Sequence, residues 1–165
     1  MSHPLAFANQ SLYQADILLS AWSHANAAGE TSDAALTLAF AGPTQTYLLD
    51  GYGWLLLAAC RIRQAPDTPP HSVTDLPPLP AGLVRPAEVE ACAQLEANGW
   101  IADLKTPVGS QPVVQSINSL AVEVTTSLAQ LEGWSKLVKA FAQHVADAID
   151  ESCLRLNRPV EWQIL

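Results

Sequence analysis

The chain has 165 residues, is 49% hydrophobic and carries a formal net charge of −8 at pH 7. This length fits one domain with a sizeable buried core. The acidic balance, with no Lys or Arg before Arg61, argues against binding to nucleic-acid phosphates or to an anionic membrane, because both require clustered cations. We therefore expect neither nucleic acid nor a membrane as a partner.

The cysteines indicate no metal or disulfide framework. Cys60, Cys92 and Cys153 are far apart, and no CxxC or CxxH spacing occurs. We predict no cofactor, and we expect the cysteines to be small buried hydrophobic residues. Polar residues between Asn9 and Asp16 divide the first apolar stretch, so no secretory signal is indicated. A cytoplasmic protein is predicted.

The N-terminal segment predicts a long helix from Leu5 to about Asn26. Leucines recur every seven residues, and each is followed three residues later by Ala or Trp, as in a helical seam: Leu5, Leu12, Leu19, Ala8, Ala15 and Trp22. Gly29 can end this helix in the left-handed conformation. Thr31 or Ser32 can cap the start of a second helix.

The stretch from Thr46 to Arg63 predicts a helix with two apolar faces, which is typical of a helix surrounded by others. It is too short for a membrane span and is interrupted by Asp50. Before it, Gly42-Pro43 allows two interpretations: a kink in a longer helix, or a start of the central helix at Pro43. We expect Arg61 and Arg63 to end the central helix, where their positive charges interact favourably with the negative end of the helix dipole.

Residues 65–84 are rich in proline, which excludes regular helix and predicts an internal connection. Its segment Leu76-Pro-Pro-Leu-Pro80 is compatible with docking into an aromatic groove of a partner. The favoured alternative is a strap across the domain's own surface, with Leu76 and Leu79 tucked in.

A third helix is predicted from Pro86 to about Leu104, with Asn98-Gly99 weakening its continuity. The Val-rich residues 113–124 fit a strand or a helix. Ser127 begins a weak capping box before a last helix that runs to about Asn157. Its expected buried face comprises Leu131, Trp134, Val138, Phe141, Val145, Ala148 and Ile149. The tail Val160 to Leu165 is expected to pack back through Trp162.

These elements predict an all-α fold, a four-helix bundle forming one domain over residues 1–165. Each helical segment carries one tryptophan, and these four side chains are expected to share the core: Trp22, Trp54, Trp100 and Trp134.

Two groups of residues are candidate sites. Asp50 lies within the most apolar helix, where a carboxylate must be paired, solvated in a cleft or neutral; with Tyr47, Tyr52 and Trp54 it is a candidate for lining a ligand cavity. His144, Asp147 and Glu151 share one helical face and form a candidate metal site, although a solvated polar face is the favoured interpretation.

Catalytic signatures are missing from the sequence. It contains no Glu-x-x-His pair, no GxSxG elbow and no phosphate-binding glycine loop. We assign no catalytic residue, and a non-enzymatic role is favoured over an enzymatic one.

Three segments resemble a known family: YLLDGYGWLLLAACRI (Tyr47 to Ile62), GWIADL (Gly99 to Leu104) and LEGWSKLVKAF (Leu131 to Phe141). The sequence is similar to uncharacterised proteobacterial proteins of pseudomonad type that carry a domain of unknown function. The resemblance implies a helical architecture and a bacterial source, and it implies no function.

Three functional hypotheses follow. The leading one is a non-enzymatic, adaptor-like interaction domain whose partner is itself, as a homodimer, or another protein. The alternative is a small-molecule or metal-binding bundle around Asp50. A further alternative is an acidic inhibitor or antitoxin that masks a basic surface.

Overall fold

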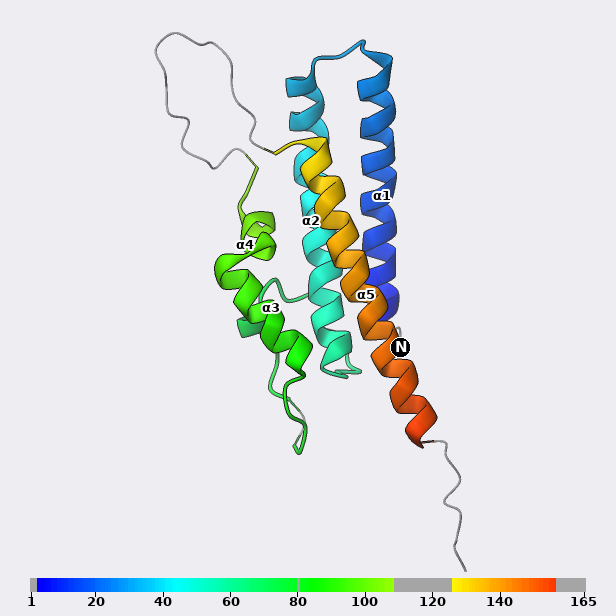
Figure 1. Cartoon of the computed structure of the whole chain (residues 1–165), viewed down its shortest axis with the longest axis vertical. Helices are drawn as coiled ribbons and strands as arrows, with labels where there is room; N and C mark the ends of the chain where they lie inside the picture. Colours follow the sequence, from blue (N-terminus) through cyan, green and yellow to red (C-terminus); the bar gives the residue numbers. More distant parts are fainter. Residues whose placement is uncertain (1–2, 80, 109–125, 157–165) are drawn as a thin grey trace, which may run out of the picture.

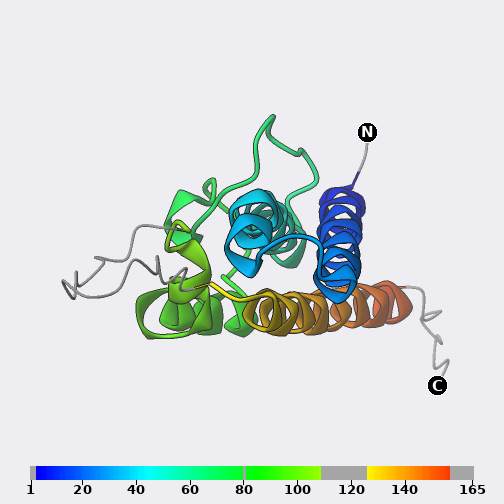
Figure 2. The same cartoon turned by 90° about the horizontal axis from the view of Figure 1, so that it is seen from above.

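The computed structural model describes residues 3–79, 81–108 and 126–156, and its regular structure in these ranges is helical without strands. The elements are α1 (Pro4–Ala28), α2 (Asp33–Ala59), the 3-10 turn η1 (Val73–Asp75), α3 (Ala87–Asn98), α4 (Trp100–Lys105) and α5 (Leu128–Leu156). The long helices α1, α2 and α5 pack together, and the short α3/α4 pair lies on the side of α2 away from α1 (Figures 1 and 2). The all-α prediction is confirmed.

Local signals set the ends of the first two helices. The His3 side chain accepts a hydrogen bond from the backbone N–H of Leu5 at the start of α1. Gly29 ends α1 with a φ of 68°, in the left-handed conformation that glycine adopts at low cost. Ser32, rather than Thr31, caps α2 through a bond from the N–H of Ala35. The predicted boundaries are confirmed to within two residues.

Pro43 lies inside α2 rather than at its start, so the interpretation that the central helix begins there is wrong. The side chain of Pro43 is exposed, and proline removes a single backbone N–H from the helix. The hydroxyl of Thr46 donates to the carbonyl of Gly42, 3.1 Å away. The stretch from Thr46 is therefore the C-terminal half of one long helix.

The end of α2 differs from the prediction because the helix stops at Ala59, before the arginines. Arg61 has a φ of 55°, and its N–H donates to the carbonyl of Ala58 while that of Ile62 donates to Leu57. This pattern of two bonds is the Schellman motif, in which glycine is the usual residue. Arg61 and Arg63 thus follow the last turn instead of belonging to it.

The C-terminal half of α2 is surrounded, as predicted: residues 51–58 are all buried. One side contributes to a first core cluster shared with α1, α4 and α5, which contains Ala8, Leu12, Ala15, Leu19, Trp22, Leu36, Ala41, Leu48, Trp54, Leu55, Leu57, Leu104, Leu131, Trp134, Val138 and Ala142. The other side contributes to a second cluster with η1, α3 and α4, which contains Tyr52, Leu56, Cys60, Val73, Val89, Cys92 and Ile101. Trp100 is half-buried and packs against both clusters.

The predicted third helix is divided into α3 and α4 at Gly99, where the backbone is extended. A Cβ on Gly99 would stand 2.7 Å from a methyl carbon of Leu95, so glycine permits this tight break. None of the helices in the described ranges combines the length and the apolar character that a membrane span requires.

The last helix begins as predicted, since the Ser127 hydroxyl accepts a hydrogen bond from the N–H of Gln130. Its buried face includes Leu131, Trp134, Val138 and Val145. Ala148 is exposed and lies off this face, which corrects its assignment. The predictions for residues 113–124 and for the tail with Trp162, and the side chain of Cys153, lie outside the described residues.

Candidate functional site

The proline-rich connection crosses the protein's own surface. Residues 64–79, here called the strap, run along α2, and Leu76 and Leu79 pack half-buried against the core clusters. At Gly53 the strap touches the backbone of α2 so closely that an added Cβ would collide with the carbonyl oxygen of Pro70. This arrangement agrees with the strap interpretation rather than with a free proline ligand.

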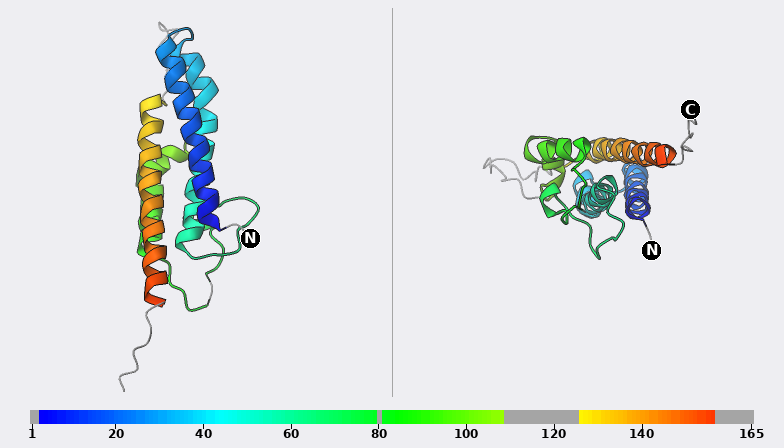
Figure 3. Two further views of the ribbon diagram at one scale, coloured as in Figure 1. Left: turned by 90° about the vertical axis from the view of Figure 1, so that its right-hand side faces the viewer. Right: turned by 90° about the horizontal axis from the view of Figure 1, so that it is seen from below.

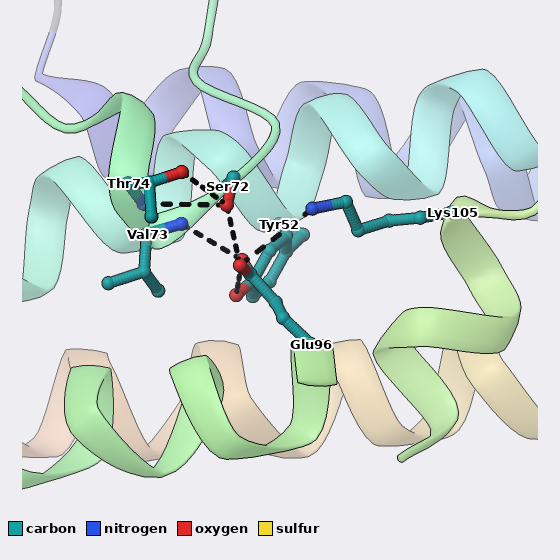
Figure 4. Close-up of polar contacts among 6 residues, drawn as sticks. All are labelled: Tyr52, Ser72, Val73, Thr74, Glu96 and Lys105. Carbon is teal, nitrogen blue, oxygen red and sulfur yellow. Dashed lines mark hydrogen bonds and ion pairs between the residues drawn. The ribbon is translucent and has the colours of Figure 1, made fainter. Parts of the chain in front are cut away.

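Glu96 of α3 anchors the strap to the helices (Figure 4). Its Oε1 atom accepts from the Tyr52 hydroxyl at 2.8 Å and from the backbone N–H of Val73 at 2.9 Å. Its Oε2 atom accepts from the Ser72 hydroxyl at 2.6 Å and forms an ion pair with Lys105 at 3.7 Å. The Glu96 side chain is only 9% exposed. We call these five residues the Glu96 network.

The Glu96 network is a structural anchor rather than a catalytic centre. It joins four elements, because Tyr52 lies on α2, Ser72 and Val73 begin the η1 turn, and Lys105 ends α4. A carboxylate has about four acceptor positions, and the four contacts engage both oxygens of Glu96. The carboxylate therefore has little capacity left to act as a general base.

Tyr52, Cys60 and Cys92 of the second core cluster are held in their neutral forms. Burial, the nearby Cys92 and the hydrogen bond to Glu96 raise the pKa of the Tyr52 hydroxyl far above its ordinary value. Burial raises the pKa of the Cys92 thiol to about 11 and also raises the pKa of Cys60. Both thiols stay protonated at neutral pH, so neither is activated as a nucleophile.

A second buried contact ties α4 to α2. The side-chain amide of Gln45 donates to the carbonyl oxygens of Leu104, at 2.5 Å, and Thr106, at 2.6 Å. The last carbonyl groups of a helix have no N–H partner within the helix, and the amide of Gln45 supplies hydrogen bonds to two of them at the end of α4. No pattern in the sequence had singled out Gln45.

The candidate ligand residues around Asp50 separate into different environments. Asp50 and Trp54 line an open groove of about 820 Å³ between α2 and the strap. The Asp50 carboxylate is 3.0 Å from Nε2 of His71 and its side chain is 29% exposed. Tyr52 instead joins the Glu96 network, because residues two apart on a helix point in nearly opposite directions, and Tyr47 packs half-buried against the first core cluster.

The candidate metal residues do not converge. His144 lies 3.2 Å from Glu88 of α3, whereas Asp147 accepts a hydrogen bond from Gln143 at 2.8 Å. His144 and Glu151 border a cleft of about 260 Å³ that Asp147 does not line. Among the described residues no group of three His, Cys, Asp or Glu side chains could hold a metal ion.

Helix α1 lies at the outside of the three-helix arrangement, beside α2 and α5 (Figure 3). Its exposed side borders α5, because Asn9, Tyr13, Ser20 and His24 line grooves shared with α5 residues. This α1 outer face consists of exposed residues on one side of the helix: Ala6, Asn9, Gln10, Tyr13, Ile17, Ser20, Ala21 and His24. Tyr13 is 67% exposed and Ile17 is 50% exposed. The face contains no acidic residue, no Lys and no Arg. Asp16 lies beside it and is paired with Lys139 of α5 at 2.5 Å.

Comparisons with known proteins add no relative: no family model, no curated protein and no solved structure matches the chain.

Proposed function

We propose that this chain is a non-enzymatic protein-interaction domain that associates with a second copy of itself through the α1 outer face. The observation that carries the proposal is this uncharged surface, with Tyr13 67% and Ile17 50% exposed, on a chain of net charge −8. Large exposed apolar side chains grouped on one face are typical of interaction surfaces.

The α1 outer face can contact a second copy without burying a carboxylate. Two copies of a chain with charge −8 repel each other, and burying an unpaired carboxylate in their contact would be costly. The α1 outer face avoids this cost because it carries no carboxylate, and the adjacent Asp16 is already paired with Lys139. A helix face that pairs with its own copy gives a closed two-fold dimer.

The dimer is expected to be weak. The face extends from Ala6 to His24, which at 1.5 Å per residue is about 27 Å. One helix face of this length buries an area at the low end of specific interfaces. Dissociation should therefore be visible in a concentration series.

Within each copy, we assign α3 and α4 together to the position of the predicted third helix of a four-helix bundle. The packing of the α3/α4 pair against α2 supports this assignment. The α1 outer face then stays exposed, with Asn9, Tyr13, Ser20 and His24 bordering grooves toward α5.

Replacing Ile17 by glutamate is expected to weaken self-association, because a carboxylate would be desolvated within the contact. Sedimentation velocity at increasing concentration measures the change, and we expect the dimer affinity to fall by about tenfold or more.

Val84→Glu is the matched control, since Val84 is 87% exposed and lies in the segment before α3. It adds the same charge away from α1 and should leave the dimer intact. A wild-type protein that stays monomeric at all concentrations, or equal losses in the two variants, would refute the proposal.

A second candidate function is small-molecule binding in the groove beside Asp50. It is favoured by the presence of Asp50 and Trp54 among the residues that line the groove. An aralkyl amine, whose ammonium group is protonated at neutral pH, suits such a pair, because a cation is attracted to the carboxylate and to an aromatic face.

Benzylamine is the probe for this second candidate. We expect it to raise the Tm of the wild type and to leave that of Asp50→Asn unchanged. Asp103→Asn, which removes an equal charge from exposed α4, should respond like the wild type. An equal response in all three proteins, or none in the wild type, would remove this candidate.

A further inference from the structure

We propose that a groove between the end of α2 and the strap binds a small organic carboxylate with an apolar body. The groove contains Arg61 and Arg63, and we call it the arginine groove. Its volume of about 650 Å³ lies within the range of sites that hold small molecules. It adjoins the groove beside Asp50, with which it shares Pro66 and Pro77. Carboxylate binding there does not depend on the proposed self-association.

The arginine groove combines apolar walls with two cations. Its apolar lining comes from both sides of the strap and from the residue between the arginines: Ile62, Ala65, Pro66, Pro77 and Pro78. Gln64 completes the lining, and no carboxylate is among the described residues that form it. A guanidinium group binds a carboxylate through two parallel N–H···O bonds. Apolar walls suit a hydrocarbon or aromatic body attached to that carboxylate.

The surrounding charges favour a small carboxylate over an acidic peptide. The chain has a net charge of −8 and only eight Lys and Arg residues, two of which stand at positions 61 and 63. Its surface therefore repels anions except where cations are concentrated. Asp67 and Asp75 line the adjoining groove, and Glu88 and Glu151 line the cleft that Arg61 also borders. An acidic peptide that extended beyond the arginine groove would meet these carboxylates.

The backbone that carries the arginines is fixed. The N–H of Arg61 donates to the carbonyl of Ala58, and that of Ile62 donates to Leu57. Ile62 packs against both core clusters, as does Leu76, which precedes the opposite wall at Pro77. The groove is therefore formed before a ligand enters, and little ordering free energy is lost on binding.

The conformation of Arg61 supports a role for its side chain. Its φ of 55° is left-handed, which glycine adopts at lower cost than arginine. A strained residue in place of the usual glycine is a feature of functional sites. Arg63 is exposed, and among the described residues it takes part in no ion pair. Its guanidinium group is thus available to a ligand.

Phenylacetate is the probe, because it has the aromatic body of benzylamine and the opposite charge. We expect it to bind the wild type in isothermal titration calorimetry. Arg63→Gln should raise its Kd by about tenfold or more, since charge-assisted hydrogen bonds are lost. Lys136→Gln removes an equal charge from the groove between α1 and α5 and should leave the Kd unchanged. Phenylacetamide, which has the same shape without the charge, should bind much more weakly than phenylacetate.

Several results would overturn carboxylate binding in this groove. One is the absence of phenylacetate binding to the wild type at about 10 mM. Others are equal Kd values for Arg63→Gln and Lys136→Gln, or equal affinities for phenylacetate and phenylacetamide. Arg61→Gln is the second variant should Arg63→Gln fail to fold, and it is expected to raise the Kd as well. Sedimentation of the unliganded protein tests self-association separately, so the two proposals fail independently.

Discussion

Glu96→Ala is expected to destabilise the protein by about 3–5 kcal/mol, because it removes the acceptor for three protein donors and for Lys105. The donors are the hydroxyls of Tyr52 and Ser72 and the backbone N–H of Val73. They lie where water has little access, since the Glu96 side chain is only 9% exposed. Urea denaturation followed by circular dichroism measures the change in the free energy of unfolding.

Two milder variants separate the loss of acceptors from the loss of packing. Glu96→Gln keeps the size of the side chain and one acceptor oxygen, so its cost should be smaller than that of Glu96→Ala. Tyr52→Phe removes one donor of the Glu96 network and should cost about 1 kcal/mol, because Glu96 Oε1 retains its bond from Val73. If Glu96→Ala were as stable as the wild type, the network would not anchor the strap.

The second large effect is expected from Gly53→Ala. Although alanine is normally the better helix former, the added methyl group would collide with the Pro70 carbonyl and lie 3.0 Å from Cβ of Pro69. Both contacts belong to the strap, so the strap must move away from α2. We expect a loss of about 3 kcal/mol in the free energy of unfolding, measured by urea denaturation.

Gly133→Ala is the matched control because Gly133 also lies inside a helix, α5, but has no neighbouring atom near an added Cβ. Here the propensity of alanine acts alone, and we expect a gain of about 0.5–1 kcal/mol. The two substitutions are chemically identical and have opposite expected signs. A gain in both would mean that the strap does not contact α2 in solution.

These predictions concern the features that were hardest to foresee. Glu96 carries one signal in the sequence: it follows Val89 by seven residues and Cys92 by four, so it shares their buried side of α3. A carboxylate on that side requires partners. Nothing local identifies those partners, because Tyr52 is 44 residues away and Ser72 is 24 residues away.

The predictions around Asp50 agree with the structure where they depended on local sequence and differ from it where they depended on tertiary packing. Asp50 was predicted to be paired or solvated, because it is a carboxylate in an apolar helix. The contact of Asp50 with His71 and its position in a groove are consistent with this prediction. The grouping of Asp50 with Tyr47 and Tyr52 was based on nearness in sequence. The structure places Tyr52 in the second core cluster, away from Asp50, because residues two apart on a helix point about 200° apart. Tyr47 packs against the first core cluster.

Sequence alone determined the all-α class, the caps at Gly29 and Ser127, a cap at Thr31 or Ser32, and the buried character of the central helix. Each of these depends on hydrogen bonds or apolar spacing within a few residues, and such local interactions can be read directly along a chain. The continuity of α2 through Pro43, the contact of the strap with Gly53 and the Glu96 network were decided by tertiary packing. Their energies come from groups that folding brings together from distant parts of the chain, so no local pattern encodes them.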